Sequence, residues 1–290
     1  MLTKVAIFFL YLLSLLPFWV LYLLSDAVFI ILFYVAKYRR KVVQENLRNA
    51  FPEKTAAERS QIERQFYRYL GDLLVESVKM FSISREQLNQ HFHVANPEML
   101  NSYFANKQSI IGAVGHYGNW EMAALALSLC TDHKKLIVYK PIKNKQIEAV
   151  TNQTRGKFGA QLVAMKATMR TLVSLKNEQI ITVFVSDQTP VREETQYFAS
   201  FLNQPTAIFL GVEKLAKLTN SAVIFCDIRV VKRGYYSCTF VPLINEPKRT
   251  AEHEITDLHV QYLEKVIREE PAYWLWSHRR WKFKPEDIHR

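Results

Sequence analysis

The chain has little cysteine for its length. Its 290 residues include three cysteines, Cys130, Cys226 and Cys238, which lie far apart and form no Cys-x2-Cys pair. Isolated cysteines in odd number supply neither a disulfide framework nor a tetrahedral zinc site. The sequence therefore predicts a protein of a reducing compartment, and we expect no metal site and no cofactor.

Glycine is also scarce, and the glycine-based catalytic motifs are missing. There are eight glycines, and none belongs to a G-x-S-x-G, G-x-G-x-x-G or phosphate-loop pattern; H-E-x-x-H is absent as well. These absences exclude the commonest routes to a serine hydrolase, a dinucleotide enzyme, a nucleotide hydrolase or a zinc protease. His91 and His93 are spaced like metal ligands on a strand, but a solvated strand face is the favoured interpretation.

One long apolar run is present near the N-terminus. Residues 5–24 are apolar or aromatic except for Ser14 and Pro17. As a helix, this run covers about 30 Å, the thickness of the hydrocarbon layer of a bilayer. A secretory signal is the alternative, but no A-x-A-like cleavage site follows the run. We expect Ser25 and Asp26 to cap a second, interfacial helix over residues 27–36.

Positive charge follows these apolar segments. Four cations crowd residues 37–41, whereas Lys4 alone precedes the run. This asymmetry places the following domain on the cytoplasmic side. We therefore divide the chain into a membrane anchor, residues 1–41, and a cytoplasmic domain, residues 42–290.

The domain shows the pattern of an α/β fold. A capping box, Thr55-Ala-Ala-Glu58, predicts an amphipathic helix of about seven turns. From residue 107 onward strands and helices alternate, which predicts a central, mostly parallel sheet flanked by helices. Ligands of such sheets bind at the carboxyl ends of the strands. The expected strands are residues 109–114, 136–139, 161–164, 180–185 and 222–231; helices are expected at 122–129 and 207–219, and residues 235–241 are expected to return as an antiparallel hairpin.

The segment at residues 110–121 predicts a strand, a turn and a helix start. His116 lies in the turn, Asn119 has the position of an N-cap, and Glu121 falls in the first helical turn, where the helix dipole favours a carboxylate. His116 and Glu121 can meet only because the histidine precedes the helix. We predict a dyad in which Glu121 orients His116, and a histidine buried only for packing is the alternative. Since no side-chain nucleophile is evident, the dyad is expected to activate a hydroxyl of the substrate.

Several stretches resemble known proteins. The segment Gly-His-Tyr-Gly-Asn-Trp-Glu at residues 115–121 resembles the His-x4-Asp/Glu motif of glycerolipid acyltransferases, and most closely that of the late acyltransferases of lipid A biosynthesis. Four further stretches resemble the same family in the same order: residues 46–53, residues 138–159 with Arg155, the Asp-Gln turn at residues 186–190, and the Trp-x-His-x-Arg ending at residues 274–282.

The resemblance implies a bacterial inner-membrane O-acyltransferase with its catalytic domain facing the cytoplasm. Acyl carrier protein would be the donor, and a hydroxyl of a lipid A precursor the acceptor. Catalysis is expected from His116, Glu121, Arg155 and Asp187. Lys140 stands where many members have arginine, which puts a bidentate contact there in doubt. The residues expected to bind substrate are Asn119, Trp120, Lys140, Asn144, Gln188, Arg279 and Arg280.

The charge of the domain favours anionic partners. The formal net charge is +11, and residues 134–170 hold nine basic residues against a single acidic one, Glu148. Such a segment attracts anionic headgroups or an acidic carrier protein, and the basic, aromatic residues 274–282 are typical of a membrane interface. Acylation of a lysophospholipid, an aminolipid or another glycolipid stays open. A non-catalytic basic membrane adaptor is a distant alternative, and no nucleic-acid partner is expected.

Overall fold

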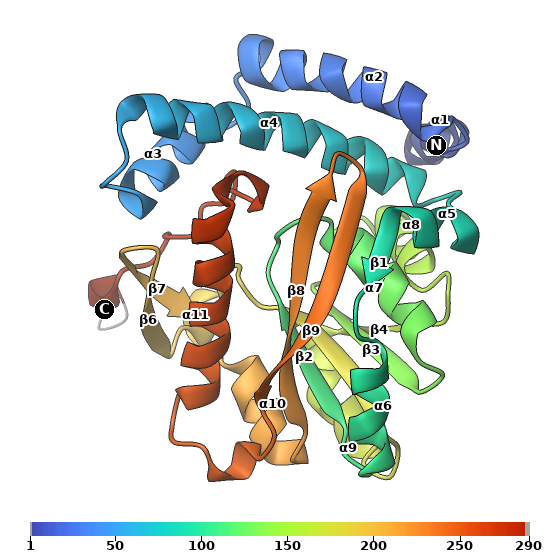
Figure 1. The fold of residues 1–290 in the computed structure, drawn as a ribbon, viewed down its shortest axis with the longest axis vertical. Coiled ribbons are helices and arrows are strands. Elements are labelled where there is room, and N and C mark those ends of the chain that lie inside the picture. The colour runs from blue at the N-terminus through green and yellow to red at the C-terminus, as the bar shows by residue number, and fades with distance from the viewer. Residues whose placement is uncertain (1, 288–290) are drawn as a thin grey trace.

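A seven-stranded sheet forms the centre of this computed structural model, which describes residues 2–287 (Figure 1). The strands lie in the order β1-β9-β8-β2-β5-β3-β4, and all neighbours are parallel except β8 and β9. The predicted fold class and the antiparallel hairpin are confirmed. The strands are β1 (Phe92–Val94), β2 (Ile110–Val114), β3 (Lys134–Tyr139), β4 (Gln161–Ala164), β5 (Ile180–Val185), β8 (Ala222–Lys232) and β9 (Tyr235–Ile244).

Helices cover both faces of the sheet. They are α5 (Arg85–His91), α6 (Glu98–Ala105), α7 (Trp120–Cys130), α8 (Lys145–Arg155), α9 (Thr168–Ser174), α10 (Gly211–Thr219) and α11 (Glu254–Glu269). Every residue of β2 is buried. Side chains alternate across a strand, so Ile111 and Ala113 pack in the core beside α10 and α11, whereas Ile110 and Val114 pack in a second core beside α5, α6 and α7.

Two local expectations are wrong. A small antiparallel hairpin, β6 (Tyr197–Phe201) and β7 (Gln204–Ile208), was not expected, and it takes the first residues of the helix predicted at residues 207–219. His91 ends α5 instead of lying on a strand with His93, and its Nδ1 lies 2.6 Å from the carbonyl oxygen of Gly234.

The N-terminal apolar run is two helices, not one. α1 (Leu2–Ser14) ends before Pro17, and α2 (Phe18–Ile30) continues into a π-helical turn, Ile31–Val35. Proline fixes its own φ and lacks an N–H, so it suits the residue just before a helix and not the middle of one. Ser25 and Asp26 lie inside α2, so the expected helix start at these residues is also wrong.

The α2 helix packs along a long helix of the domain. This partner is α4 (Ala56–Lys79), which begins at the predicted capping box and follows α3 (Arg40–Ala50). The hydroxyl of Ser25 donates to Asp72 at 2.6 Å, and Lys79 donates to the carbonyl of Ser14 at 3.1 Å. Residues Phe18–Val35 are long and apolar enough to cross a membrane by length and composition, with a mean hydropathy of 2.2. Figure 1 shows α2 and α4 side by side across one end of the sheet.

The C-terminal aromatic stretch lies in the core. Trp274 is 1% exposed and Trp276 is fully buried, and the two rings meet edge to face. The backbone beside them pairs with the turn after β2, through a bridge between Tyr117 and Trp274. The expectation that this stretch forms a membrane-interface cluster is therefore wrong.

Candidate active site

His116 is held at the carboxyl end of β2 by a tightly packed turn. A Cβ at Gly115 would come 2.5 Å from a methyl of Leu263, and Gly118 has a φ of +56° with Ile228 against it. The positive φ at Gly118 therefore favours glycine, and at Gly115 any side chain would force Leu263 to move. The carbonyl of His116 accepts from the N–H of Leu275 at 3.1 Å, so the C-terminal stretch fixes the turn from the other side.

The partner of His116 is Asp187. β2 and β5 are adjacent parallel strands, so the residues that follow them meet at the same edge of the sheet. Nδ1 of His116 lies 2.5 Å from Oδ1 of Asp187, and the backbone N–H of His116 donates to Oδ2 at 2.8 Å. The indole N–H of Trp274 donates to the same oxygen at 2.7 Å. Three donors therefore hold this buried carboxylate.

The contacts of Asp187 set its charge and the tautomer of His116. Burial opposes ionisation of Asp187, but the charge of His116 and the hydrogen bonds from His116 and Trp274 outweigh it and lower the pKa to about 2. An ionised Asp187 requires a proton on Nδ1 of His116, which leaves Nε2 of a neutral imidazole as the acceptor. Nε2 faces the side-chain amide of Gln188 at 3.0 Å. Gln188 thus occupies the position from which a proton would be taken.

Glu121 does not contact His116, so the predicted His116–Glu121 dyad is wrong. Its carboxylate forms a two-pronged ion pair with Arg155, through Nε at 2.7 Å and through Nη2. Nη1 of Arg155 takes no part in this pair. Glu121 lies in the first turn of α7 and Arg155 in the last turn of α8, where the two helix dipoles favour these charges. The pair joins the two helices beside the catalytic turn.

Asn119 is an N-cap, as predicted, but it is closed to substrate. Its side-chain oxygen accepts from the N–H of Met122 at 2.8 Å, and its amide donates to Glu76 at 2.7 Å. The residue is fully buried, so the expectation that it binds substrate is wrong. Asn144 also caps a helix, accepting from two N–H groups at the start of α8, but it is exposed.

The two C-terminal arginines differ. Arg280 is 1% exposed and donates to the carbonyl of Ala207, and its Nε and Nη1 have no hydrogen-bond partner within residues 2–287. Burial lowers its pKa to about 10, while the charge of Asp187 opposes that shift. Arg280 therefore lies in the core near Asp187, against the expectation of substrate contact. Arg279 is exposed.

An apolar cavity begins beside His116. The ring of Trp120 meets His116 edge to face, with 4.9 Å between centroids, and Trp120 also lines the cavity. The cavity runs between α7 and the sheet. Its walls carry no charged side chain; they are Phe92, Val94, Val114, Trp120, Ala123, Ala124, Leu127, Ile137, Val183, Val185, Cys226, Cys238 and Phe240.

Several cations follow the neighbouring strands at the same edge. Lys140 and Lys143 come after β3, and Lys166 and Arg170 come after β4; all four are exposed. Other cations of residues 134–170 are engaged: Lys134 pairs with Glu178 at 2.6 Å, for example. Part of the basic segment is therefore structural. Residues 2–287 contain no group of three or more His, Cys, Asp or Glu side chains placed to hold a metal ion.

Two supporting residues were missed by the sequence reasoning. Glu76 of α4 is fully buried and holds Asn119, and Trp274 holds Asp187. A lone carboxylate inside the mainly apolar residues 73–81 is a usable signal for Glu76. No spacing rule connects Trp274 with a residue that lies so far away in the sequence.

Comparisons with known proteins find relatives of this chain. A family model described as bacterial lipid A biosynthesis acyltransferase matches residues 1–283. The lipid A biosynthesis palmitoleoyltransferase of Escherichia coli (strain K12) is 24% identical over 252 residues, 86% of this chain and 80% of that protein. The lipid A biosynthesis lauroyltransferase of the same strain is 23% identical over 289 residues, 99% of this chain and 93% of that protein. A lipid A biosynthesis acyltransferase of Haemophilus influenzae is 23% identical over 276 residues, 93% and 84% of the two chains.

Proposed function

The chain belongs to the bacterial lipid A biosynthesis acyltransferase family and is an acyltransferase, and from this premise we propose that it transfers a fatty acyl group from a thioester to a hydroxyl of a lipid A precursor. The observation that carries the proposal is the His116–Asp187 pair, placed at the mouth of an apolar cavity. Acid–base groups beside an apolar cavity suit a reaction between a polar acceptor and an acyl donor.

His116 acts as the general base. The acceptor hydroxyl displaces the amide of Gln188 from Nε2, and Nε2 takes the hydroxyl proton as the oxygen attacks the thioester carbonyl. Asp187 stabilises the imidazolium that forms. When the tetrahedral intermediate collapses, the C–S bond breaks, the thiolate leaves, and the imidazolium returns the proton to it. The products are an ester and a free thiol, so no outside reductant or oxidant is needed.

The oxyanion is assigned to the amides at the start of α7. The first N–H groups of a helix lack partners inside the helix and carry the positive end of its dipole. Arg155 reaches the same corner through its ion pair with Glu121, and its remaining Nη1 is suited to the donor's phosphate or to the oxyanion. Glu121 therefore positions Arg155 and not His116.

The apolar cavity is assigned to the acyl chain. Trp120 both touches His116 and lines the cavity, so a chain lying inside would present its thioester near Nε2. Cys226 and Cys238 also line the space; Cys226 of β8 pairs with Phe240 of β9, and Cys238 pairs with Ile228, so the two cysteines are diagonal neighbours on adjacent strands. Burying each CH2 of the chain contributes about 0.8 kcal/mol, which favours a long acyl group over a short one.

The donor is assigned to acyl carrier protein, whose acidic surface would meet the exposed Lys140, Lys143, Lys166 and Arg170. These cations lie at the sheet edge that also holds His116, because β2, β5, β3 and β4 are consecutive and parallel. Opposite charge mainly speeds encounter and is screened by salt.

Membrane association is assigned to α1 and α2, in the inner membrane with the domain on the cytoplasmic side. Their exposed side chains are mostly apolar, apart from Lys4 and Asp26, and Phe9, Trp19 and Leu23 are more than 60% exposed. Because α2 is bonded along its other face to α4, we infer that it lies in the interface and does not cross the bilayer.

The test is acyl transfer by the purified full chain. Lipid A precursor is supplied with either an acyl carrier protein thioester or the matching coenzyme A thioester, and the products are measured by mass spectrometry. His116→Ala should lower the rate by about 10² to 10⁴, and Lys248→Ser, at an exposed site far from the turn, should not. A parent chain that acylates only lysophospholipid would overturn the acceptor, and one that prefers the coenzyme A thioester would overturn the donor.

A further inference from the structure

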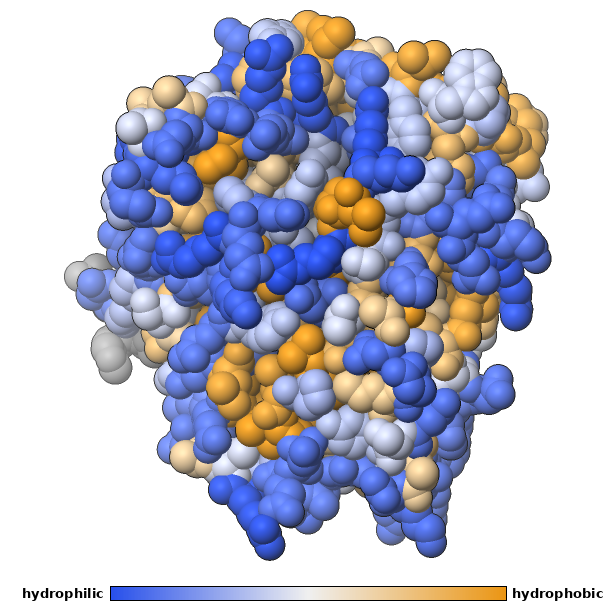
Figure 2. All heavy atoms as spheres, viewed as in Figure 1, coloured by the Kyte–Doolittle hydropathy of each residue, from blue (hydrophilic) through white to orange (hydrophobic). Residues whose placement is uncertain are grey.

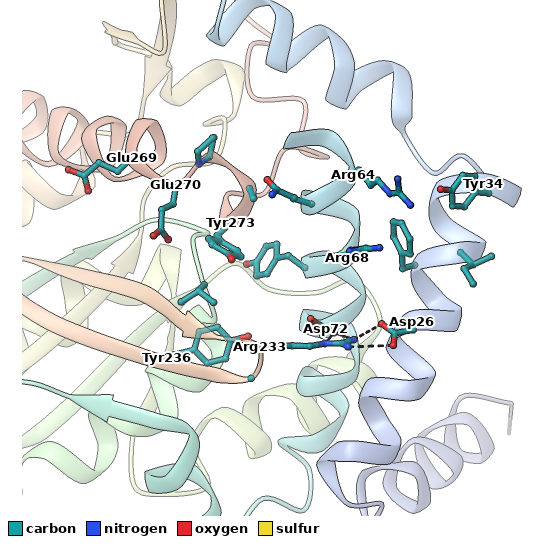
Figure 3. Close-up of a pocket in the computed structure, with 18 residues that line it drawn as sticks. Asp26, Tyr34, Arg64, Arg68, Asp72, Arg233, Tyr236, Glu269, Glu270 and Tyr273 are labelled. Atoms are coloured by element: carbon teal, nitrogen blue, oxygen red, sulfur yellow. Dashed lines mark hydrogen bonds and ion pairs between the residues drawn. The ribbon is translucent and has the colours of Figure 1, made fainter. Parts of the chain in front are cut away.

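A second cavity lies away from the catalytic histidine. It has a volume of about 960 Å³ and opens between α2, α4, the β8–β9 hairpin and the end of α11 (Figure 3). His116, Trp120, Asp187 and Gln188 do not line it. Tyr69, one of its lining residues, is buried and donates to the carbonyl of Gly118, so the catalytic turn forms part of the wall behind the cavity. The cavity is therefore separate from the proposed acyl site.

Two arginines on one wall have no carboxylate partner. Arg64 and Arg68 lie one turn apart on α4, and among residues 2–287 no carboxylate is within 4.0 Å of either guanidinium. Figure 3 shows both side chains extending from α4 toward α2 and Tyr34. Arg233, by contrast, is satisfied by Asp26 and Asp72, each at 2.7 Å. Two unpaired cations side by side form a ready site for an anionic group.

The edge of the cavity next to these arginines is apolar and exposed. Ile30 is 52% exposed and Tyr34 is 49% exposed, and both line the cavity, Ile30 at the end of α2 and Tyr34 in the π-helical turn that follows it. The guanidinium of Arg68 also lies over the ring of Phe29, 5.3 Å from its centroid. Figure 2 shows apolar side chains gathered at the upper right, over α1 and α2. Cations directly above an exposed apolar helix match a ligand with an anionic head and hydrocarbon chains.

The charges of the other walls limit how negative that head can be. The lining holds three arginines, Arg64, Arg68 and Arg233, against four acids, Asp26, Asp72, Glu269 and Glu270. Arg233 is paired with Asp26 and Asp72, and Glu269 with Arg229, so Arg64 and Arg68 are the guanidinium groups left to meet an anion. Two guanidinium groups suit the one negative charge of a phosphodiester, whereas the nearby acids would repel the several charges of a polyphosphate or a nucleic acid. A membrane glycerophospholipid has one phosphodiester and two acyl chains.

We propose that this cavity binds the headgroup of a bilayer glycerophospholipid, with its phosphodiester between Arg64 and Arg68 and its acyl chains along Ile30, at the end of α2, and Tyr34, in the π-helical turn that follows. Arginine's planar fork donates two parallel hydrogen bonds to a phosphate, and two forks one turn apart hold it from two sides. The bound lipid would orient α2 and α4 on the membrane surface. This proposal stands whether or not the acceptor of acyl transfer is a lipid A precursor.

The test is native mass spectrometry of the full chain, released from maltoside micelles that contain equal amounts of phosphatidylethanolamine, phosphatidylglycerol and diacylglycerol. The parent chain should retain one phospholipid and no diacylglycerol. Arg64→Ser combined with Arg68→Ser should lower the retained fraction at least tenfold. The charge-matched control is Lys176→Ser combined with Lys248→Ser, at two exposed sites outside the cavity, and it should retain lipid like the parent.

Other outcomes decide against the proposal. Equal retention by the Arg64/Arg68 variant, or retention of diacylglycerol, shows that the phosphate is not recognised there. If soluble glycerophosphoethanolamine binds as strongly as the whole lipid, the acyl chains do not contribute to binding along α2. If loss of the Arg68–Phe29 contact unfolds the double variant, Arg64→Ser alone should still lower retention about threefold, and unchanged retention overturns the site. No turnover is measured, so failure here is distinct from failure of the acyl-transfer assay.

Discussion

Two buried carboxylates lie on either side of the catalytic turn, and they are held alike but charged differently. Asp187, behind His116, accepts three hydrogen bonds from His116 and Trp274, and its pKa falls to about 2. Glu76, on α4, also accepts three, from Tyr22, Asn119 and Tyr236, yet burial raises its pKa to about 7.

The difference lies in the donors. His116 can carry a positive charge, and that charge repays the desolvation of Asp187. The donors to Glu76 are two phenols and an amide, which are neutral, and the nearby Asp72 adds a repulsive negative charge. Three neutral hydrogen bonds do not offset the burial of Glu76, whereas the charge of His116 together with hydrogen bonds does offset the burial of Asp187. Asp187 is therefore suited to stabilise an imidazolium, and Glu76 is suited to join α2, α4 and the catalytic turn.

The largest effect on activity should come from neutralising Asp187. Asp187→Asn removes the charge that fixes the tautomer of His116, so kcat should fall by about 10³. Glu121→Gln should cost about tenfold, because it weakens only the pair with Arg155. Steady-state kinetics of both variants checks the order. If the kcat of the Asp187→Asn chain stays within tenfold of the parent, or if the kcat of the Glu121→Gln chain falls below that of the Asp187→Asn chain, Glu121 is again the favoured partner of His116.

Removing residues 1–36 should disturb the surroundings of Glu76 more than those of Asp187. The deletion takes away Tyr22, opens Glu76 to water and leaves Lys79 without the Ser14 carbonyl, so we expect a loss of roughly 3 kcal/mol or more in the free energy of unfolding. Urea unfolding in detergent measures it, and the full chain carrying Trp19→Ser, at an exposed site, is the control. A deleted chain as stable as the parent would mean that α1 and α2 only tether the domain.

The pH dependence of stability should separate the two sites. The pKa of Glu76 is raised from 4.5 to about 7. Between these pH values the folded state binds more protons than the unfolded state. The free energy of unfolding therefore falls as pH rises from 4.5 to 7, by up to about 3 kcal/mol. The pKa of Asp187 is lowered from 3.8 to about 2, so its contribution is present above pH 4 and is lost as pH falls toward 2.

Glu76→Gln tests this assignment. Its side-chain oxygen can accept from Asn119 and Tyr236, and its amide can donate to the hydroxyl of Tyr22. The loss of stability between pH 5 and 8 should therefore disappear in urea unfolding, while Glu98→Gln, at an exposed site on α6, should keep it. An unchanged slope in the Glu76 variant would show that Glu76 stays ionised throughout.

The smallest effects on kinetics should distinguish Arg155, beside the catalytic turn, from the exposed lysines around it. Arg155→Ala should lower kcat about tenfold at saturating substrate, because it frees Glu121 and removes Nη1 from the site. Lys143→Ala should raise KM two- to threefold and lose this effect in high salt, because an exposed charge acts on encounter. Kinetics at two ionic strengths checks both. If both variants lose the same activity at low and at high salt, residues 134–170 act by stabilising the fold and not by attracting the donor.

Local patterns predicted the elements because their causes are local. The strands at residues 161–164 and 180–185 match β4 and β5 residue for residue, and the Thr55 capping box begins α4 as expected. Turn and cap chemistry also placed His116 before α7 and Asn119 at its N-cap. Pro17 is also a local signal, and it divides the apolar run into two helices.

The sequence by itself determined that the chain is an α/β protein with an apolar N-terminal segment and a histidine at the end of a buried strand. Only the tertiary structure decided which carboxylate that histidine meets. Glu121 is close in sequence but turns with α7 toward Arg155, whereas Asp187 is 71 residues away and arrives because β2 and β5 are neighbours in the sheet. The same holds for Arg280 and Trp274, whose burial follows from the path of the whole chain. Hydrophobic periodicity and capping act within a few residues, while the pairing of strands and the packing of the core depend on contacts between distant segments.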